Sequence, residues 1–354
     1  MNYIEELLAA RRLPPLLQMA DGTPVTRENW AQRRAELLDI MCREVYGYAP
    51  PAPVGVSVTV GKCKEKDYAG KGNTRELTLS FPTDRGEFSF PVVEILPCGV
   101  ENVPVFVVLN FRPDLPDRYV PVEEILDAGC GLVRVYYNDI SADREDGFTS
   151  GLAAMYDREK YTWGKLRMWA FAASRVMDYL TTREGVDHSR IAVAGHSRLG
   201  KTALLAAATD PRFSLACVNC SGCAGDAITR SKRGERVKEI TEKFGYWFCE
   251  NYKKYVDREQ EMPFDQHFLL AAVAPRRVAL GTALEDVWAD PDSEYLCACA
   301  AAPAWELLGV RGFVHQDRLP RAGEDLSIGA IAFHLREGTH FFSRADWHRY
   351  LCRI

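Results

Sequence analysis

The segment Gly195-His-Ser-Arg-Leu-Gly-Lys201 has the clearest potential for chemistry. An apolar run precedes it and a stretch rich in Ala and Leu follows Ser197, so we expect a strand, a tight turn and a helix. A serine at such a turn exposes its hydroxyl as a nucleophile, and the next backbone N–H, that of Arg198, can donate to a developing oxyanion. The pattern departs from G-x-S-x-G, because Leu199 holds the second glycine's place and Gly200 follows it. A serine that merely caps a helix is the alternative, but the flanking strand and helix favour a nucleophile.

A serine hydroxyl needs a base that takes its proton, and the base is expected later in the chain. The histidines that follow Ser197 are His267, His315, His334, His340 and His348. His340 lies in the loop Arg336–Ser343, directly after the apolar run Ile328–Leu335, where a loop-borne base is expected. His334 lies inside that run, His315 has no strand before it, and His348 falls in a predicted C-terminal helix, Arg344–Leu351. We therefore predict His340 as the base.

A carboxylate must orient the imidazole, and two candidates follow the apolar run Arg277–Leu284. Glu285 and Asp286 both lie at the expected C-terminal end of a strand. Asp290 precedes Pro291 and is expected to cap a helix. Spacing does not separate Asp286 from Glu285, and the residues alone leave the acid open between these two.

Short apolar runs alternate with helical patterns from Pro104 onward, which is typical of a mostly parallel, doubly wound sheet covered on both faces. Before that point, residues Arg27–Tyr46 have the pattern of an amphipathic helix. The segments Val56–Val60, Glu76–Phe81 and Phe88–Leu96 have that of strands, and we expect them to form the antiparallel start of the same sheet. We predict an α/β-hydrolase fold, with residues 1–50 as an N-terminal helical extension and 51–354 as one catalytic domain.

The composition excludes several classes of protein. The net charge is −5 and the pI is near 5.9, so the basic footprint of a nucleic-acid-binding protein is missing. No apolar run approaches the roughly 18 residues of a membrane-spanning helix. The first residues, MNYIEELLAARR, lack the apolar core of a signal peptide. We therefore expect a cytoplasmic protein, or a secreted one if a leader has been removed, with no nucleic-acid or membrane partner.

The cysteines are expected to be reduced thiols rather than a disulfide framework. Eleven are scattered from Cys42 to Cys352. Cys217, Cys220 and Cys223 form a C-x-x-C-x-x-C run that could bind a metal, but the first two fall in or beside an apolar segment and no fourth ligand follows at short range. We expect buried cysteines that act as small hydrophobic residues, and we predict neither a metal nor a cofactor.

From Pro104 to the C-terminus the chain resembles the glucuronoyl esterases, carbohydrate esterase family 15, especially their bacterial members. The resemblance rests on Gly195–Lys201 with its displaced glycine and on Gly338-Thr-His340. Further ordered blocks are Trp163–Ala170, Ser174–Leu180, Ser221–Gly225, Tyr246–Cys249, Asp265–His267, Ala274–Arg276 and Asp286–Pro291.

The resemblance implies hydrolysis of esters between 4-O-methyl-glucuronic acid, carried on xylan, and lignin alcohols. It makes Ser197 the nucleophile, His340 the base and Arg198 the oxyanion contact, through its amide and its guanidinium. Lys201 would contact sugar hydroxyls, and Trp288 would pack against the sugar. Many members carry the acid in a Glu-Ser-Gly motif, where this chain has Cys220 before Ser221-Gly222. Other bacterial members place an aspartate two residues before the later tryptophan, which implies Asp286 here.

Three hypotheses follow. The first is a glucuronoyl esterase that acts on a small-molecule or oligosaccharide ester through an acyl-enzyme. The second keeps the same triad in an acetyl-xylan-type or general carboxylesterase. The third is a non-catalytic relative that binds a sugar or a partner, which the presence of nucleophile, base and acid disfavours.

Overall fold

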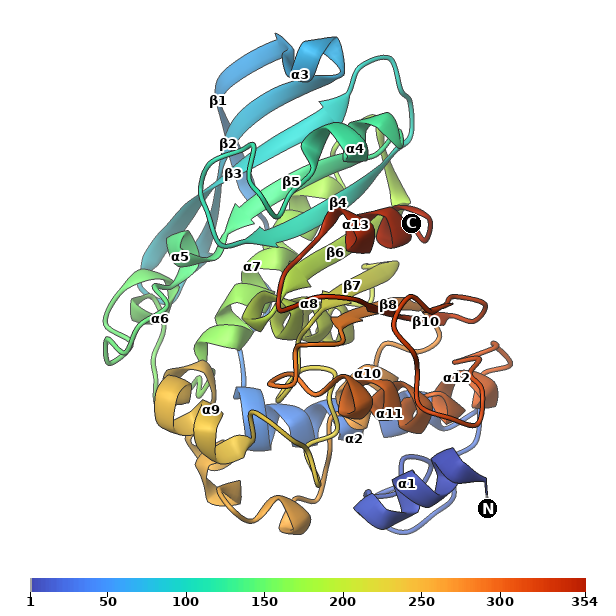
Figure 1. Cartoon of the computed structure of the whole chain (residues 1–354). Coiled ribbons are helices and arrows are strands. Elements are labelled where there is room, and N and C mark those ends of the chain that lie inside the picture. Colours follow the sequence, from blue (N-terminus) through green and yellow to red (C-terminus); the bar gives the residue numbers. More distant parts are fainter. Residues whose placement is uncertain (1) are drawn as a thin grey trace.

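Ten strands form a single sheet in the computed structural model, which describes residues 2–354 (Figure 1). The strand order is β1-β2-β3-β5-β4-β6-β7-β8-β10-β9. The bounds are β1 Ser57–Lys66, β2 Gly72–Thr83, β3 Gly86–Pro97, β4 Val103–Asn110, β5 Gly131–Tyr136, β6 Val186–His196, β7 Leu215–Asn219, β8 Arg277–Ala283, β9 Asp325–Leu326 and β10 Ile331–Arg336. From β5 to β10 the neighbouring strands are parallel, whereas β1, β2, β3 and β9 join antiparallel. The predicted parallel sheet with an antiparallel start is confirmed.

Helices cover both faces of this sheet. They are α1 Tyr3–Arg11, α2 Trp30–Met41, α3 Asp67–Gly70, α4 Val122–Asp127, α5 Tyr137–Ile140, α6 Gly151–Ala154, α7 Lys165–Leu180, α8 Arg198–Thr209, α9 Val237–Phe244, α10 His267–Ala271, α11 Pro291–Ala301, α12 Pro303–Leu307 and α13 Arg344–Leu351. A π-helical turn, Cys42–Tyr46, continues α2. None of the helices in residues 2–354 combines the length and the apolar character needed to cross a membrane.

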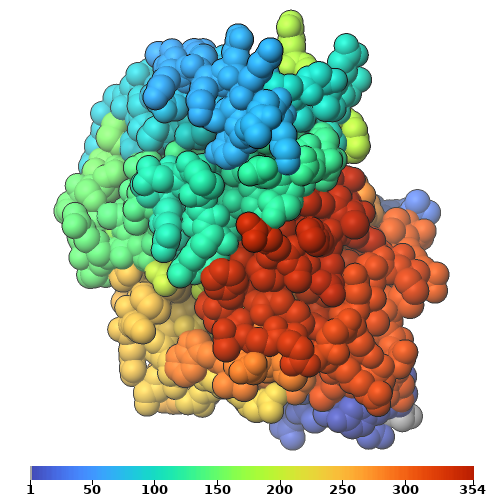
Figure 2. Space-filling view, turned by 45° about the horizontal axis from the view of Figure 1, so that its top comes forward, coloured from blue at the N-terminus to red at the C-terminus, as the bar shows by residue number. Residues whose placement is uncertain are grey.

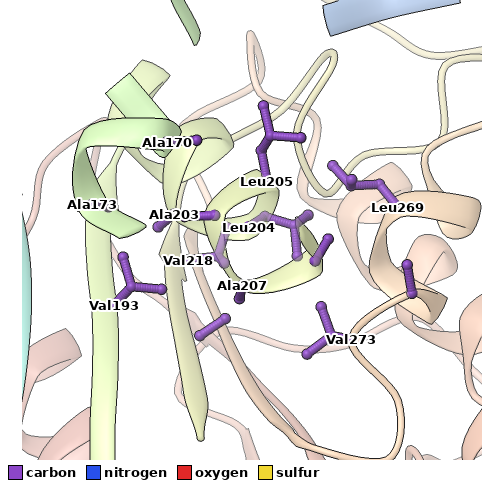
Figure 3. Packing of buried hydrophobic residues seen from close by; sticks show 14 of the residues in the cluster. Ala170, Ala173, Val193, Ala203, Leu204, Leu205, Ala207, Val218, Leu269 and Val273 are labelled. Atoms are coloured by element: carbon purple, nitrogen blue, oxygen red, sulfur yellow. The ribbon is translucent and has the colours of Figure 1, made fainter. Parts of the chain in front are cut away.

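The core has two parts, one on each face. The larger part includes the buried side of α7 and α8 together with α2, α10 and α11, and the smaller part joins α4 and α13 to the opposite face. Figure 3 shows α8 between α7, with Ala170 and Ala173, and α10, with Leu269, while Val193 of β6 and Val218 of β7 lie against it. All residues of β4 are buried, as expected for a central parallel strand. The helix that carries Ser197 at its start is therefore fixed by packing along its length.

Several boundaries differ from those expected. The predicted helix Arg27–Tyr46 begins at Trp30, and the three early strands extend beyond their apolar residues. β1 continues to Lys66 although nearly all of it is exposed, because its backbone pairs with β2 through a register that shifts between Val60 and Cys63. Hydrophobic alternation does not reveal such an edge strand, since it has almost no buried side chain.

Candidate active site

Ser197 lies at a sharp turn between β6 and α8. Its backbone has φ 57° and ψ −126°, a strained combination for a residue with a side chain. Its N–H donates to the carbonyl oxygen of Asn219, at the end of β7, over 2.8 Å. The predicted strand, turn and helix are confirmed, and the turn places the serine at the carboxyl end of the parallel strands.

Two glycines allow this turn. A Cβ on Gly195 would lie 2.1 Å from the carbonyl oxygen of Leu199, in the first turn of α8. A Cβ on Gly200 would lie 2.9 Å from the carbonyl oxygen of Asn219 and 3.0 Å from Ser221 Cβ. Because both positions face backbone atoms, neither accepts a side chain unless the turn moves. The displaced second glycine is thus required where α8 passes the end of β7.

His340 and Asp286 meet at the same edge of the sheet. His340 lies in the loop after β10, and Asp286 lies in the loop after β8, the parallel neighbour of β10. His340 Nδ1 and Asp286 Oδ2 form a hydrogen bond of 2.6 Å. Glu285, the other candidate acid, is exposed. Of the two carboxylates that spacing did not separate, Asp286 and not Glu285 reaches the imidazole.

Asp286 stays ionised although it is buried. Burial alone raises the pKa of its carboxyl, but the hydrogen bond from His340 and the charge of that ring outweigh burial and lower the pKa below its usual value. Cys220 lies beside the pair, and burial raises the pKa of its thiol far above the usual range. The carboxylate can thus hold a proton on Nδ1 of His340, while the neighbouring thiol remains neutral.

Cys220, Asp286 and His340 also form a set of possible metal ligands. One ligand atom from each lies within 4.8 Å of the others. The 2.6 Å between Nδ1 and Oδ2 is a hydrogen-bond distance, whereas two ligands of one tetrahedral zinc ion, each about 2.1 Å from it, lie about 3.4 Å apart. The arrangement fits an oriented imidazole better than a metal site, because a metal would have to break the hydrogen bond.

A second histidine, His196, packs against the His340 ring. The ring centroids are 4.4 Å apart, and His196 Nδ1 contacts Asn219 Oδ1 at 2.7 Å. Burial, with a contribution from His340, lowers the pKa of His196 to about 3. His196 is therefore uncharged at neutral pH and supports the His340 ring without competing for its proton.

Ser197 and His340 line one cavity of about 320 Å³, a size suited to a small ligand. Among residues 2–354 the His340 ring makes its only hydrogen bond to Asp286, and the ring is 44% exposed. Its Nε2 has no hydrogen-bond partner within these residues and belongs to a ring that lines the same cavity as Ser197. Such catalytic hydrogen bonds commonly tighten only when substrate is bound.

The guanidinium of Arg198 is held beside the turn by Asp143. Arg198 Nη1 donates to Asp143 Oδ2, which also accepts from the Tyr137 hydroxyl at 3.1 Å. The other oxygen, Oδ1, accepts from Trp247 Nε1 at 2.7 Å and from the Tyr246 hydroxyl at 3.1 Å. Asp143 is not among the residues predicted from the sequence, although it follows the apolar run of β5 and so reaches the same sheet edge.

Lys201 and Trp288 are brought together through Glu235, another residue that was not predicted. Lys201 Nζ donates to the carbonyl oxygen of Ser221 at 2.5 Å and pairs with Glu235 Oε2 at 3.4 Å. Trp288 Nε1 donates to Glu235 Oε1 at 3.3 Å. Lys201 is almost fully buried, whereas Trp288 is 54% exposed. All three line the Ser197 cavity, so the predicted pair lies where a ligand would sit.

The other histidines considered from the sequence, together with Cys217 and Cys223, fall outside this cavity. His334 lies within β10 and contacts Asp346 at 2.8 Å, and His348 is exposed on α13, as expected for both. All eleven cysteines are unpaired. Cys217 and Cys223 belong to the two opposite parts of the core, so the C-x-x-C-x-x-C run does not converge on one point.

Comparisons with known proteins agree with this geometry. A family model described as "Glucuronyl esterase, fungi" matches residues 84–309. The chain is 34% identical to Carbohydrate esterase MZ0003 from an unknown prokaryotic organism, over 99% of this chain and 90% of that protein. It is 31% identical to 4-O-methyl-glucuronoyl methylesterase 1 of Wolfiporia cocos, over 86% of this chain and 74% of that protein. Among solved structures, the glucuronoyl esterase from Solibacter usitatus is 34% identical, with a TM-score of 0.88 and coverage of 96% of both chains.

Proposed function

This chain belongs to the glucuronoyl esterases of carbohydrate esterase family 15, and we propose that it hydrolyses esters of 4-O-methyl-glucuronic acid with the triad Ser197, His340 and Asp286. It is accordingly a carboxylic ester hydrolase. The observation that carries the assignment of the triad is the 2.6 Å hydrogen bond between His340 and Asp286 in the cavity that exposes Ser197.

In the first half of the reaction, Ser197 Oγ attacks the ester carbonyl carbon while His340 Nε2 takes the hydroxyl proton. Asp286 keeps the proton on Nδ1 and stabilises the imidazolium that forms. The carbonyl oxygen gains negative charge beside Arg198, whose backbone N–H begins α8 and whose guanidinium is fixed by Asp143. His340 then protonates the departing alcohol, which leaves a glucuronoyl ester on Ser197.

In the second half, a water molecule replaces the alcohol. His340, now neutral, takes a proton from this water as its oxygen attacks the acyl carbon. Collapse of the second tetrahedral intermediate returns the proton to Ser197 Oγ and releases the uronic acid. The same oxyanion contacts act in both halves, since negative charge develops on the same oxygen each time.

The wall of the cavity supports a sugar acid as the acyl part. The Trp288 indole offers an apolar face, and its N–H is tethered to Glu235. Lys201 has three ammonium hydrogens, of which its contacts to Ser221 and Glu235 use two. A donor and a carboxylate acceptor thus remain beside the aromatic ring, which suits a sugar with hydroxyls around an apolar face. Because Trp288 is 54% exposed, the rest of an oligosaccharide ester can extend past it.

Steady-state kinetics on two substrates tests the proposal. We expect benzyl D-glucuronate to be hydrolysed with a much higher kcat/KM than 4-nitrophenyl acetate, and Ser197→Ala to lose both activities. Glu235→Gln should lower kcat/KM for the glucuronate ester by about 10-fold, the effect of roughly 1.4 kcal/mol, and leave the acetate activity unchanged. If the aryl acetate were the better substrate and Glu235→Gln affected both equally, the chain would be an acetyl-xylan-type or general carboxylesterase instead.

A further inference from the structure

A second cavity, of about 450 Å³, lies on another part of the surface. It is formed by β1, β2, α3, the middle of β3, β5 and the segment after β4, and it shares no lining residue with the Ser197 cavity. On the face shown in Figure 2, the blue segment around β1 and α3 lies beside the teal segment that follows β4. We call this space the Arg134 cavity, after the residue that distinguishes it.

Arg134 carries a buried charge into this cavity. It lies on β5, between Val93 of β3 and Val108 of β4, and is 5% exposed. Its Nε and Nη1 have no hydrogen-bond partner in the part of the chain that the structure describes. A buried charge without a partner is expensive, so an acceptor supplied from outside would be bound favourably.

The neighbouring charged groups do not meet this need. Lys64 pairs with Asp67 at 2.5 Å, and Asp67 also accepts from the Thr74 hydroxyl at 2.9 Å. Burial lowers the pKa of Arg134, and the charges of Asp139, Asp114 and Glu76 raise it at longer range without forming a hydrogen bond to its side chain. Asp114 and Glu76 also line the cavity. These carboxylates can accept hydrogen bonds from the hydroxyl groups of a ligand.

Apart from Lys62, the rest of the wall is largely apolar. Its members are Tyr68, Pro91, Val92, Val93, Pro113 and Leu115. A ligand that contacts every part of this wall therefore needs an acid group to pair with Arg134, hydroxyls to donate to the carboxylates and a hydrocarbon face to pack on the apolar residues. A sugar that carries a carboxylate has all three features, and the volume is sufficient for one such residue.

We propose that the Arg134 cavity is a second carbohydrate subsite, which binds the carboxylate of a uronic acid on the Arg134 guanidinium. The choice of a uronic acid rests on the proposed function, because such an acid is the product released at Ser197. The segment after β4 joins the two places: Pro113 lines the Arg134 cavity, while Phe111 and Tyr119 pack on His196 with ring centroids 6.2 and 5.6 Å apart. The subsite thus lies next to the segment that packs on His196, the neighbour of the His340 ring.

The test is isothermal titration of the intact chain with sodium D-glucuronate, on the parent protein, Arg134→Met and Lys201→Met. Methionine keeps most of the length of the arginine stem and removes its charge and donors. We expect Arg134→Met to lose one binding event, with at least a 10-fold weaker affinity, while Lys201→Met keeps that event. D-Glucose and acetate serve as ligand controls and should each bind at least 10-fold more weakly, since one lacks the carboxylate and the other the hydroxyls.

Hydrolysis of benzyl D-glucuronate by the same samples separates this proposal from the proposed function. Arg134→Met should keep kcat/KM within about twofold of the parent, a difference of less than 0.5 kcal/mol, and should melt at the same or a higher temperature without ligand. Unchanged glucuronate binding in Arg134→Met would overturn the subsite even if hydrolysis is intact. A large fall in melting temperature would also overturn it, because Arg134 would then be held by the fold itself. Equal binding of acetate and glucuronate would overturn the sugar assignment.

Discussion

Replacement of Asp143 by asparagine should disturb Arg198 and little else. The asparagine oxygen can remain at the place of Oδ1, where it accepts from Trp247 Nε1 at 2.7 Å and from the Tyr246 hydroxyl at 3.1 Å. Its amide nitrogen then occupies the place of Oδ2, which accepts from Arg198 Nη1 and from the Tyr137 hydroxyl. An amide N–H₂ and a guanidinium are both donors. The change therefore removes the anchor of Arg198 and keeps the contacts to the two aromatic side chains on Oδ1.

The size of the effect follows from the contacts that remain. A hydrogen bond between charged groups contributes about 1.5–3 kcal/mol. Arg198 still stacks over the Trp247 ring, 4.9 Å from its centroid, but such stacking contributes about 0.5–1 kcal/mol at a partly exposed site. Complete loss of one oxyanion donor costs roughly 10²–10³ in kcat. A displaced guanidinium keeps part of its effect, so we expect kcat to fall about 10–100-fold, or about 1.4–2.7 kcal/mol.

The assay is steady-state hydrolysis of methyl D-glucuronate, with thermal unfolding as a measure of the fold. We expect the loss in kcat with KM changed by less than about threefold, because Arg198 acts on charge that forms in the transition state. Tyr246→Phe is the matched control: it removes one donor to Oδ1, leaves the contact of Arg198, and should keep kcat within about threefold. A folded Asp143→Asn enzyme with unchanged kcat would refute a role of Arg198 at the oxyanion. An equal loss in Tyr246→Phe would assign the effect to the aromatic surroundings instead.

Three further predictions concern the acid, the turn and the pH dependence of stability. Asp286→Asn should lower kcat about 10³–10⁴-fold, because an amide favours the wrong imidazole tautomer. The control Glu285→Gln, at an exposed position, should leave kcat within about twofold, and equal losses in the two variants would contradict the assignment of Asp286. Gly200→Ala places a Cβ 2.9 Å from the Asn219 carbonyl oxygen and should cost about 1–3 kcal/mol in urea unfolding, together with most of the activity. Burial lowers the pKa of His267 to about 4, so below about pH 6.5 the unfolded chain binds a proton that the folded chain does not. The free energy of unfolding should therefore fall toward pH 4 by up to about 1.4 kcal/mol per pH unit, and His267→Gln should remove this contribution.

Local signals in the sequence were sufficient to place Ser197 and His340 in one cavity. Ser197 and His340 each follow an apolar run, and a parallel sheet brings the carboxyl ends of such runs to one edge. The same argument placed Asp286 and Glu285 there but could not choose between them. They are adjacent in the chain, and their opposite directions depend on the turn after β8, which buries Asp286 and exposes Glu285.

The residues that the sequence did not reveal act through partners far along the chain. Asp143 matters because Arg198 and Trp247 reach it from two other segments, and Glu235 because Lys201 and Trp288 do. Neither carboxylate stands in a recognisable pattern of its own. The edge strand β1 was underestimated for a related reason, since backbone pairing with β2 and not side-chain burial defines it.

Covalent labelling tests the central claim most directly. After reaction with a fluorophosphonate, which modifies serine nucleophiles, peptide mapping by mass spectrometry should find the adduct on Ser197, in step with the loss of glucuronate-ester hydrolysis. His340→Ala should not be labelled under the same conditions, because the hydroxyl would lack its base. An adduct on Ser221, the other serine of the same cavity, or full hydrolysis after labelling of Ser197, would contradict the account.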